Sequence, residues 1–181
     1  NTLHNASMRI LEKVGIAFHE PEAVEIFKNH GFKTNNKIVF LTESQIEKAL
    51  ASTPSKFTIN APNPQNNVLI GGENPIFAPV LGTAFIVSSN GVQRRASMED
   101  HNNLCKLVQT SKYIDMNGGL MVTPWDVASE TAHLHMLLSN MTLCDKAFIG
   151  CTLTRRDAID AIEMAGILWG GKDRIRNFPI T

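Results

Sequence analysis

The second half of the sequence alternates between segments with helical spacing and short apolar runs, and this alternation constrains the fold most. Helices are predicted over residues 97–110, 128–141 and 155–169, and short strands over 113–116 and 147–150. Parallel strands need a crossover connection of about a dozen residues or more, and a helix of this length supplies one. The order therefore predicts two or three parallel βα units, too few to close a barrel.

Residues 1–55 follow a different pattern and are expected to form a small helical subdomain. Apolar residues recur at three- and four-residue steps in three segments, which predict helices that end at Gly15, Gly31 and Pro54. Gly and Pro stop a helix, because Gly adopts the left-handed conformation and Pro lacks a backbone N–H. One short strand is predicted over Lys37–Phe40.

Residues 56–181 are expected to combine a β-hairpin region with the first βα units, in an α/β fold. Asn-Gly at positions 90–91 predicts a hairpin turn, because both residues readily take positive φ angles. Short strands are predicted over Phe57–Ile59, Val68–Ile70, Ile76–Ala78, Ala84–Val87 and Val92–Arg95. The apolar spacing within the helices predicts these inward-facing residues: Leu104, Leu107, Val108, Leu134, Leu137, Leu138, Met141, Ile159, Ile162, Ala165, and either Ile167 or Leu168.

The balance of charge argues against one class of partner. The sequence has 17 Lys and Arg residues and 17 Asp and Glu residues, whereas a nucleic-acid partner needs an excess of basic charge. No window approaches the roughly 18 uncharged apolar residues of a membrane span, so no membrane partner is expected. Cys105, Cys144 and Cys151 form no CxxC motif, which favours reduced thiols and a cytoplasmic location.

The stretch from Tyr113 to Val127 holds the candidate site residues. It contains a short apolar run, an Asn-Gly-Gly break and a Trp-Asp pair before the next helix. A strand that ends in a Gly-rich loop, followed by polar residues and a helix, is how an α/β protein places groups that face a ligand. The candidates are Asp115, Asn117, Gly118, Gly119, Trp125 and Asp126, with Pro79 and Gly82 as weaker ones.

Each of these candidates also has a structural interpretation. Asp126 precedes a helix and could cap its N-terminus, and Trp125 could pack in the core. The two glycines could form only a tight turn. Asp115 could be a carboxylate tied to backbone amides at the end of a strand.

A second constellation, of imidazoles and thiols, raises the question of a zinc site. It consists of His133, His135, Cys144 and Cys151. In a helix, residues two apart point about 200° away from each other, so the two histidines cannot share a metal ion. The two cysteines fall on either side of a predicted strand. We therefore predict no metal bound directly by this chain.

Several pieces of sequence occur in a characteristic order along nearly all of the 181 residues. They are His4–Gly15, Glu22–Lys28, Ile70–Gly72, Gly91–Ala96 with Asp100, Asp115–Gly119, Pro124–Val127, and Glu163–Ala165 with Gly170–Gly171. In this order they resemble the N-terminal part of the trimethylamine:corrinoid methyltransferase family, which includes relatives that act on quaternary amines such as glycine betaine. Their order, rather than any single piece, carries the resemblance.

The resemblance implies a fold and a place within it. The family's fold is a TIM (β/α)8 barrel with an N-terminal extension, so the chain would be the N-terminal portion of a barrel preceded by the small helical subdomain. Asn1 opens inside an amphipathic pattern without Met, and the residues from Phe178 onward read like the start of a strand, as expected of a fragment. The family's pyrrolysine, or the residue that replaces it, is expected beyond Thr181 with the catalytic residues.

The resemblance also implies the chemistry. A methyl group would move from trimethylamine, or from a quaternary amine such as glycine betaine, to Co(I) of a corrinoid (cobalamin) carried by a cognate partner protein. A quaternary amine leaves as a neutral group, so its site needs aromatic faces, to which a carboxylate can add. The expected substrate-binding residues are Asp115, Asn117, Gly118, Gly119, Trp125 and Asp126. The full-length protein is expected to be a homo-oligomer.

Two other functions stay open at this point. One is a different TIM-barrel enzyme that shares only the scaffold, since a fold does not fix a function. The other is a non-catalytic scaffold that binds a corrinoid protein. No activity is expected of the fragment alone, because a partial barrel leaves sheet edges open and lacks most loops of the site.

Overall fold

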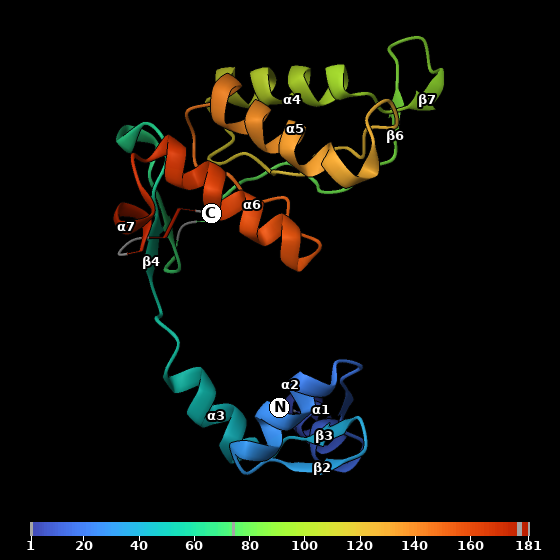
Figure 1. Cartoon of the computed structure of the whole chain (residues 1–181), viewed down its shortest axis with the longest axis vertical. Helices are drawn as coiled ribbons and strands as arrows, with labels where there is room; N and C mark the ends of the chain where they lie inside the picture. Colours follow the sequence, from blue (N-terminus) through green and yellow to red (C-terminus); the bar gives the residue numbers. More distant parts are fainter. Residues whose placement is uncertain (1, 74, 177–178, 181) are drawn as a thin grey trace. The chain divides into compact units, whose positions relative to one another are not determined.

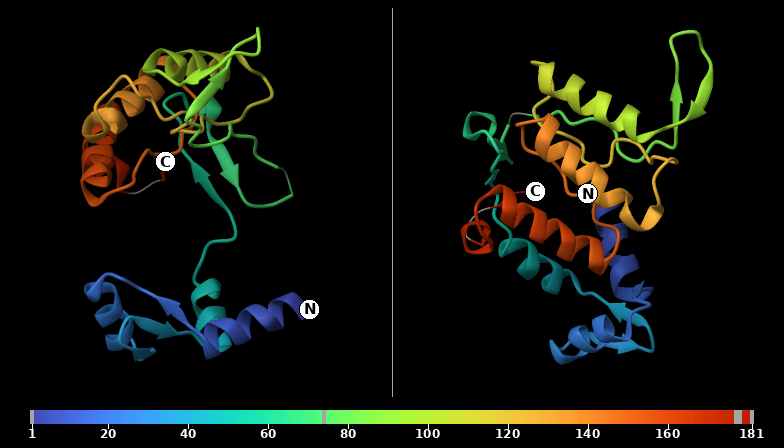
Figure 2. Two further views of the ribbon diagram at one scale, coloured as in Figure 1. Left: turned by 90° about the vertical axis from the view of Figure 1, so that its right-hand side faces the viewer. Right: turned by 45° about the horizontal axis from the view of Figure 1, so that its top comes forward.

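The computed structural model describes residues 2–73, 75–176 and 179–180, and the chain divides into two compact units (Figures 1 and 2). Unit 1 comprises Asn1–Pro54 and unit 2 comprises Ser55–Thr181. Among the described residues, no helix combines the length and the apolar character needed to cross a bilayer. The strand expected to begin at Phe178 starts outside the described residues.

Unit 1 combines three helices with a small antiparallel sheet. Its elements are α1 (Thr2–Lys13), β1 (Ile16–Ala17), α2 (Pro21–Asn29), β2 (Lys33–Asn35), β3 (Ile38–Phe40) and α3 (Glu43–Ala51). β3 is the expected strand; it lies between β1 and β2, and Val39 at its centre is fully buried. β1 and β2 are additional to the expectation, because strands of two and three residues give no alternating pattern to detect.

Unit 2 contains two β-hairpins and the larger helices. Its elements are β4 (Phe57–Ile59), η1 (Pro64–Asn66), β5 (Val68–Ile70), β6 (Phe85–Val87), β7 (Gln93–Arg95), α4 (Met98–Thr110), α5 (Ser129–Leu143), α6 (Arg155–Leu168) and α7 (Lys172–Ile175). β4 pairs with β5 and β6 pairs with β7, both antiparallel, which confirms the hairpin at Asn90-Gly91. α5 packs against both α4 and α6, and Figure 1 shows it between them.

Three of the predicted strands do not form a regular sheet. They are the runs over 76–78, 113–116 and 147–150. Instead, two isolated parallel bridges join Thr83 to Val122 and Asn117 to Phe148. The parallel direction that the sequence predicts is therefore present at single residue pairs, and the structure is mixed α/β with small sheets.

Side chains compete with the strand ladder in these segments. The Phe77 N–H donates to Asp115 Oδ2 at 2.8 Å, and the Ile114 carbonyl accepts from Lys146 Nζ at 2.6 Å. A backbone group that is committed to a side chain cannot also pair with a neighbouring strand in the regular pattern. This competition occupies backbone groups of the 76–78 and 113–116 runs.

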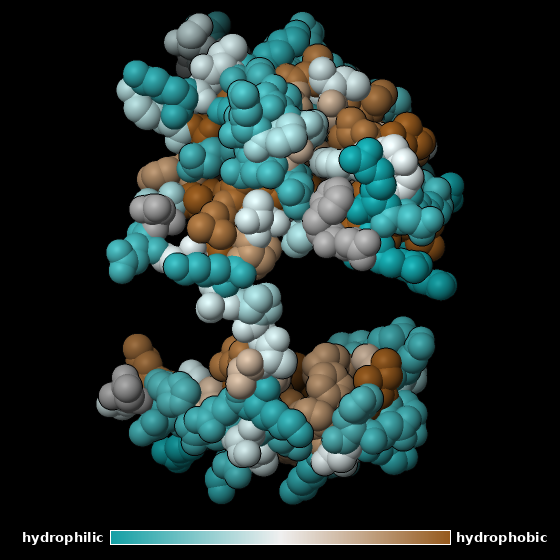
Figure 3. Space-filling model, turned by 90° about the vertical axis from the view of Figure 1, so that its left-hand side faces the viewer, coloured by the Kyte–Doolittle hydropathy of each residue, from teal (hydrophilic) through white to brown (hydrophobic). Residues whose placement is uncertain are grey.

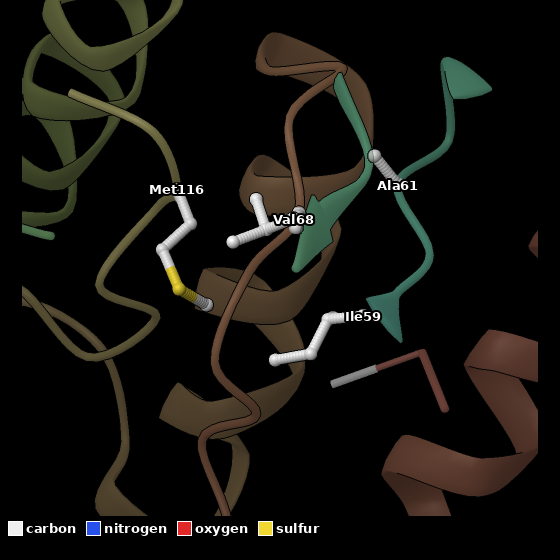
Figure 4. Close-up of a cluster of buried hydrophobic side chains, with 5 residues drawn as sticks. Ile59, Ala61, Val68 and Met116 are labelled. Carbon is white, nitrogen blue, oxygen red and sulfur yellow. The ribbon is translucent and has the colours of Figure 1, made fainter. Parts of the chain in front are cut away.

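Buried apolar side chains of unit 2 form two clusters. In the first, Ile59, Ala61 and Val68 from the β4–β5 region lie beside Met116, as Figure 4 shows, and Ala147 belongs to the same cluster. The second cluster consists of Cys105, Val108, Met121 and Cys144. Both clusters use residues from the irregular segments, so these segments are core although they are not regular strands.

Two helices bury only part of the predicted face, although Val108 of α4 and Ala165 of α6 are buried as predicted. In α4, Leu107 is 63% exposed, whereas His101 and Cys105 are fully buried. In α6, Ile159 and Ile162 are 48% and 52% exposed. Apolar spacing identifies an apolar face but not what covers it. Hydrophobic residues accordingly reach the surface in patches on the side of the molecule seen in Figure 3.

Candidate functional site

The stretch over residues 113–127 is paired with another segment of unit 2 at its Asn117. The Asn117 N–H donates to the Ala147 carbonyl at 2.7 Å, and the Asn117 carbonyl accepts from the Ile149 N–H at 3.1 Å. These two bonds form the parallel bridge to the 147–150 segment. Asn117 is thereby fixed in the interior of unit 2, where it is fully buried.

Neighbouring backbones approach the glycine pair from two sides. A Cβ on Gly118 would lie 3.0 Å from the Pro79 carbonyl oxygen, and a Cβ on Gly119 would lie 2.0 Å from the Ile149 carbonyl oxygen. Gly119 also has a φ of 71°, a left-handed conformation that favours glycine. The pair is therefore required for close backbone approach and not only for a tight turn.

Asp115 lies at the entrance to this stretch and is exposed. Its Oδ2 accepts from the Phe77 N–H at 2.8 Å, which matches the structural alternative of a carboxylate tied to a backbone amide. Asp115 also lines a cavity of about 560 Å³, together with Gln109 and Lys146. Lys146 Nζ is occupied there by two backbone carbonyls at 2.6 Å each.

Trp125 and Asp126 lie at the other end of the stretch, beside the start of α4. The Trp125 N–H donates to the Ala96 carbonyl at 3.0 Å, and Trp125 is 62% exposed, so its ring is not packed in the core of unit 2. Asp126 Oδ1 accepts from the Met98 N–H at 2.8 Å. Asp126 therefore caps the preceding helix α4, whereas α5, which it was expected to cap, has Ala128 at its N-cap without a side-chain bond.

The six predicted residues thus share one stretch, but they do not gather in one cavity. Asp115 and Trp125 mark its two ends, and Asn117, Gly118 and Gly119 are buried between them. An exposed indole face next to a carboxylate is an arrangement that attracts an organic cation. Trp125 and Asp126 are neighbours in the sequence at this end of the stretch, and both are exposed.

A group of buried polar side chains behind the glycine pair was not predicted. His101 and Cys105 of α4, Asn117, and Asn140 of α5 are all fully buried. A signal was present in the sequence, since His101, Cys105 and Val108 recur at steps of four and three on one helix face. Apolar spacing alone does not indicate that His101 faces inward, because Asn and His side chains are usually exposed or half-buried.

The imidazoles and thiols of the second constellation have separate partners. His133 is buried, with Nε2 3.0 Å from Asp160 Oδ2 on α6, and His135 on the same helix is exposed. Burial raises the pKa of the Cys144 thiol, and raises that of Cys151 to about 11. Across residues 2–73, 75–176 and 179–180, no three His, Cys, Asp or Glu side chains are grouped so that they could hold a metal ion.

An ion pair and a capping box fix the start of α4 near Trp125. Arg94 donates to both oxygens of Asp100, at 2.5 and 2.7 Å, and Asp100 also accepts from the Ser97 N–H at 2.8 Å. The Arg94 guanidinium is the main reason that the pKa of Asp100 lies well below its usual range, and the bonds from Ser97 lower it further.

Asp100→Asn is expected to lower the free energy of unfolding by about 1–2 kcal/mol near neutral pH, because the side chain loses its charge and part of the capping box. A carboxyl with a lowered folded-state pKa stabilises the fold above its unfolded pKa of about 4, and this stabilisation disappears as the pH falls towards the folded pKa. The difference between wild type and variant, measured by urea denaturation at several pH values, should therefore shrink below about pH 4.

The matched control for this variant is Glu99→Gln, which removes a charge from an exposed neighbour in the same helical turn. It should change stability by less than Asp100→Asn, because Glu99 takes no part in the capping box. A stability difference for Asp100→Asn that stays constant from neutral to acidic pH would contradict the role assigned to the ion pair.

Comparisons with known proteins extend along the whole chain. The family model described as trimethylamine methyltransferase (MTTB) matches residues 1–180. Glycine betaine methyltransferase of Desulfitobacterium hafniense is 40% identical over 178 residues, which are 98% of this chain and 37% of that protein. Trimethylamine methyltransferase MttB of the same species is 26% identical over 188 residues, covering 98% of this chain and 36% of that protein.

A further relative, proline betaine:corrinoid methyltransferase of Eubacterium limosum, is 32% identical over 125 residues, covering 67% of this chain and 25% of that protein. The chain thus spans little more than a third of the length of the relatives that match it most fully. In each case where the coverage is 98%, the similarity includes both units and the stretch over 113–127. The resemblance seen in the sequence is confirmed, and the chain belongs to the trimethylamine methyltransferase family.

Proposed function

We propose that the full-length protein transfers a methyl group from a quaternary amine, with glycine betaine as the first candidate, to Co(I) of a corrinoid protein. The observation that carries this proposal is the 40% identity to a glycine betaine methyltransferase, against 26% to a trimethylamine methyltransferase over the same share of the chain. A relative that is named as a corrinoid methyltransferase supports the choice of acceptor.

The proposal includes a TIM barrel in the full-length protein, of which unit 2 would supply the first strands. Two parallel bridges support it, because the segment containing Thr83 lies beside that of Val122, and Asn117 lies beside Phe148. The three segments therefore lie side by side in the order of the sequence, as consecutive barrel strands do. α4 and α5 connect them, as barrel helices would.

In this site the chain's own residues bind and orient the methyl donor. Trp125 offers an exposed ring face to a quaternary ammonium. Asp126 uses only Oδ1 for its bond to α4 among the described residues, which leaves Oδ2 for the cation. Asn117, Gly118 and Gly119 of the same stretch are buried, and Asn117 anchors the stretch to Phe148. The corrinoid, brought by its partner protein, supplies the nucleophile, and the amine leaves neutral without needing a proton.

The test uses the full-length protein with free Co(I) cobalamin and, in turn, glycine betaine, proline betaine and trimethylamine. Methylation of the cobalamin is followed by its absorbance spectrum, and the demethylated amine is quantified. Glycine betaine is expected to be the fastest donor. Trp125→Ala is expected to raise KM for it about tenfold, equivalent to the loss of about 1.4 kcal/mol of cation–π attraction. Tyr113→Ala, which removes another exposed aromatic ring of the same stretch, is the matched control and should leave KM unchanged.

Each outcome selects among the functions. Turnover of trimethylamine alone would overturn the choice of a quaternary amine. Binding of a corrinoid protein without any methyl transfer would favour the non-catalytic scaffold. If neither binding nor transfer were observed with any of the amines, the methyltransferase proposal would be wrong, and another activity on the same scaffold would have to be sought.

A further inference from the structure

The buried polar side chains behind the glycine pair form one continuous hydrogen-bonded group. Asn140 Oδ1 lies 3.2 Å from His101 Nε2 and accepts from Cys105 Sγ at 3.3 Å. The Asn117 side-chain amide in turn donates to Cys105 Sγ at 3.6 Å. Three consecutive segments of the chain, α4, the stretch over 113–127 and α5, therefore meet in this group.

The group ends on the backbone of a single residue, Gly119. The Gly119 N–H donates to Asn117 Oδ1 at 3.2 Å, and the Gly119 carbonyl accepts from Asn140 Nδ2 at 3.3 Å. Both polar groups of this glycine are thus held by buried side chains. Its Cα has no room to move towards the Ile149 carbonyl, which a Cβ would approach to 2.0 Å.

The protonation states agree with this direction of hydrogen bonding. Burial lowers the pKa of His101, so the ring is neutral near pH 7 and can donate from Nε2 to Asn140 Oδ1. Burial raises the pKa of Cys105 to about 11, so the thiol keeps the proton that it donates to the same oxygen. With two donors on Oδ1, the Asn140 amide is oriented so that Nδ2 faces the Gly119 carbonyl.

This arrangement is costly if its only role is stability. Burying polar side chains requires that all their hydrogen bonds are made, and apolar residues of similar volume would fill the same space without that condition. His101 Nδ1 in fact has no hydrogen-bond partner among the described residues. What apolar residues could not do is hold both polar groups of Gly119.

We propose that Asn140 and Asn117, supported by His101 and Cys105, are positioning residues: they hold the Gly119 backbone and thereby the stretch over 113–127, which also carries Trp125 and Asp126. This inference rests on the proposed function, in which Trp125 and Asp126 of that stretch orient the methyl donor. None of these four side chains needs to touch the substrate. Their effect on the reaction comes through the alignment of the donor, to which transfer rates are sensitive.

The test compares Asn140→Leu with His133→Gln in the full-length protein. Asn140→Leu removes all hydrogen bonds of the amide at similar volume, and it should lower kcat with glycine betaine about tenfold or more at temperatures where the variant is folded. His133→Gln perturbs another buried side chain of α5, whose bond goes to Asp160 on α6. It should lower the melting temperature but keep kcat within about twofold.

The proposal would be overturned if Asn140→Leu and His133→Gln lost equal amounts of kcat at equal losses of melting temperature. An unchanged kcat in Asn140→Leu would also overturn it. If Asn140→Leu does not fold, Cys105→Ala and Cys105→Ser replace it. Cys105→Ser keeps a hydrogen-bond donor and should preserve kcat, whereas Cys105→Ala removes the donor and should lower kcat. The same kcat in both variants would overturn the proposal.

A second readout separates this proposal from the proposed function. If the wild type methylates cobalamin from no amine, the methyltransferase proposal fails by itself. Hydrogen exchange of the Gly119 amide then decides the positioning role. Exchange about tenfold faster in Asn140→Leu but not in His133→Gln would support it, and equal exchange in the two variants would overturn it.

Discussion

Gly119→Ala in the 181-residue chain is expected to lower the free energy of unfolding of unit 2 by about 2–5 kcal/mol. The new Cβ would lie 2.0 Å from the Ile149 carbonyl oxygen, so one of the two backbones must shift. A shift would weaken the Asn117 pairing with Ala147 and Ile149, because these bonds lie directly beside the clash. In addition, alanine is strained at the φ of 71°.

The measurement is urea denaturation followed by tryptophan fluorescence. Both tryptophans, Trp125 and Trp169, belong to unit 2, so the signal reports on that unit alone. Gly91→Ala is the matched control, because Gly91 has a φ of 80° but no atom within 4 Å of the position that a Cβ would take. The control carries the conformational strain without the clash and should cost about 1–2 kcal/mol. Equal costs for the two variants would show that the backbone approach at Gly119 is not limiting.

Features encoded within a few residues could be predicted from the sequence. The hairpin at Asn90-Gly91 and the start of α4 after Ser97 follow from local turn and capping chemistry, and both are present. The glycine break after Asn117 was also predicted as a special backbone position. Its reason was not, because the close approach of Pro79 and Ile149 depends on residues about thirty to forty positions away.

The strands over 113–116 and 147–150 show where local reasoning stops. Their composition is that of strands, and their parallel direction is correct at Asn117 and Phe148. Whether a ladder forms depends on competitors for the backbone, and here the Lys146 side chain takes the Ile114 carbonyl of the 113–116 run. Such side-chain bonds involve positions that come together only in the folded chain, so spacing does not reveal them.

For the candidate stretch, the sequence indicates which side chains are polar or aromatic but not where each of them lies. Trp125 was chosen as a ring that could face a ligand, and it is exposed. Sequence order suggests that Asp126 caps the helix that follows it. In the fold, its carboxylate instead binds the Met98 N–H at the start of α4, the helix that precedes it. The sequence does not indicate that Asn140 is buried, because the apolar residues of α5 already suffice to form a buried helix face.

Phe148→Ala is expected to lower the free energy of unfolding of unit 2 by about 3–5 kcal/mol, although the segment around it is no regular strand. Phe148 is 1% exposed and is among the largest fully buried side chains of the described chain. Its ring centroid lies 6.0 Å from that of Trp169, and its backbone pairs with Asn117. Truncation would leave a cavity where the end of α6 meets the 147–150 segment.

Phe85→Ala is the matched control, because it removes the same ring from β6, where the side chain is 51% exposed. It should cost about 1 kcal/mol or less, since half of its surface is already in water. Circular dichroism should accompany the fluorescence measurement, because the loss of the Phe148 ring changes the surroundings of Trp169 directly. Similar costs for both variants would mean that the irregular 147–150 segment is not part of the stabilising core. A cost several times larger for Phe148→Ala would show that the 147–150 segment stabilises unit 2 through the buried Phe148 side chain, although it forms no regular strand.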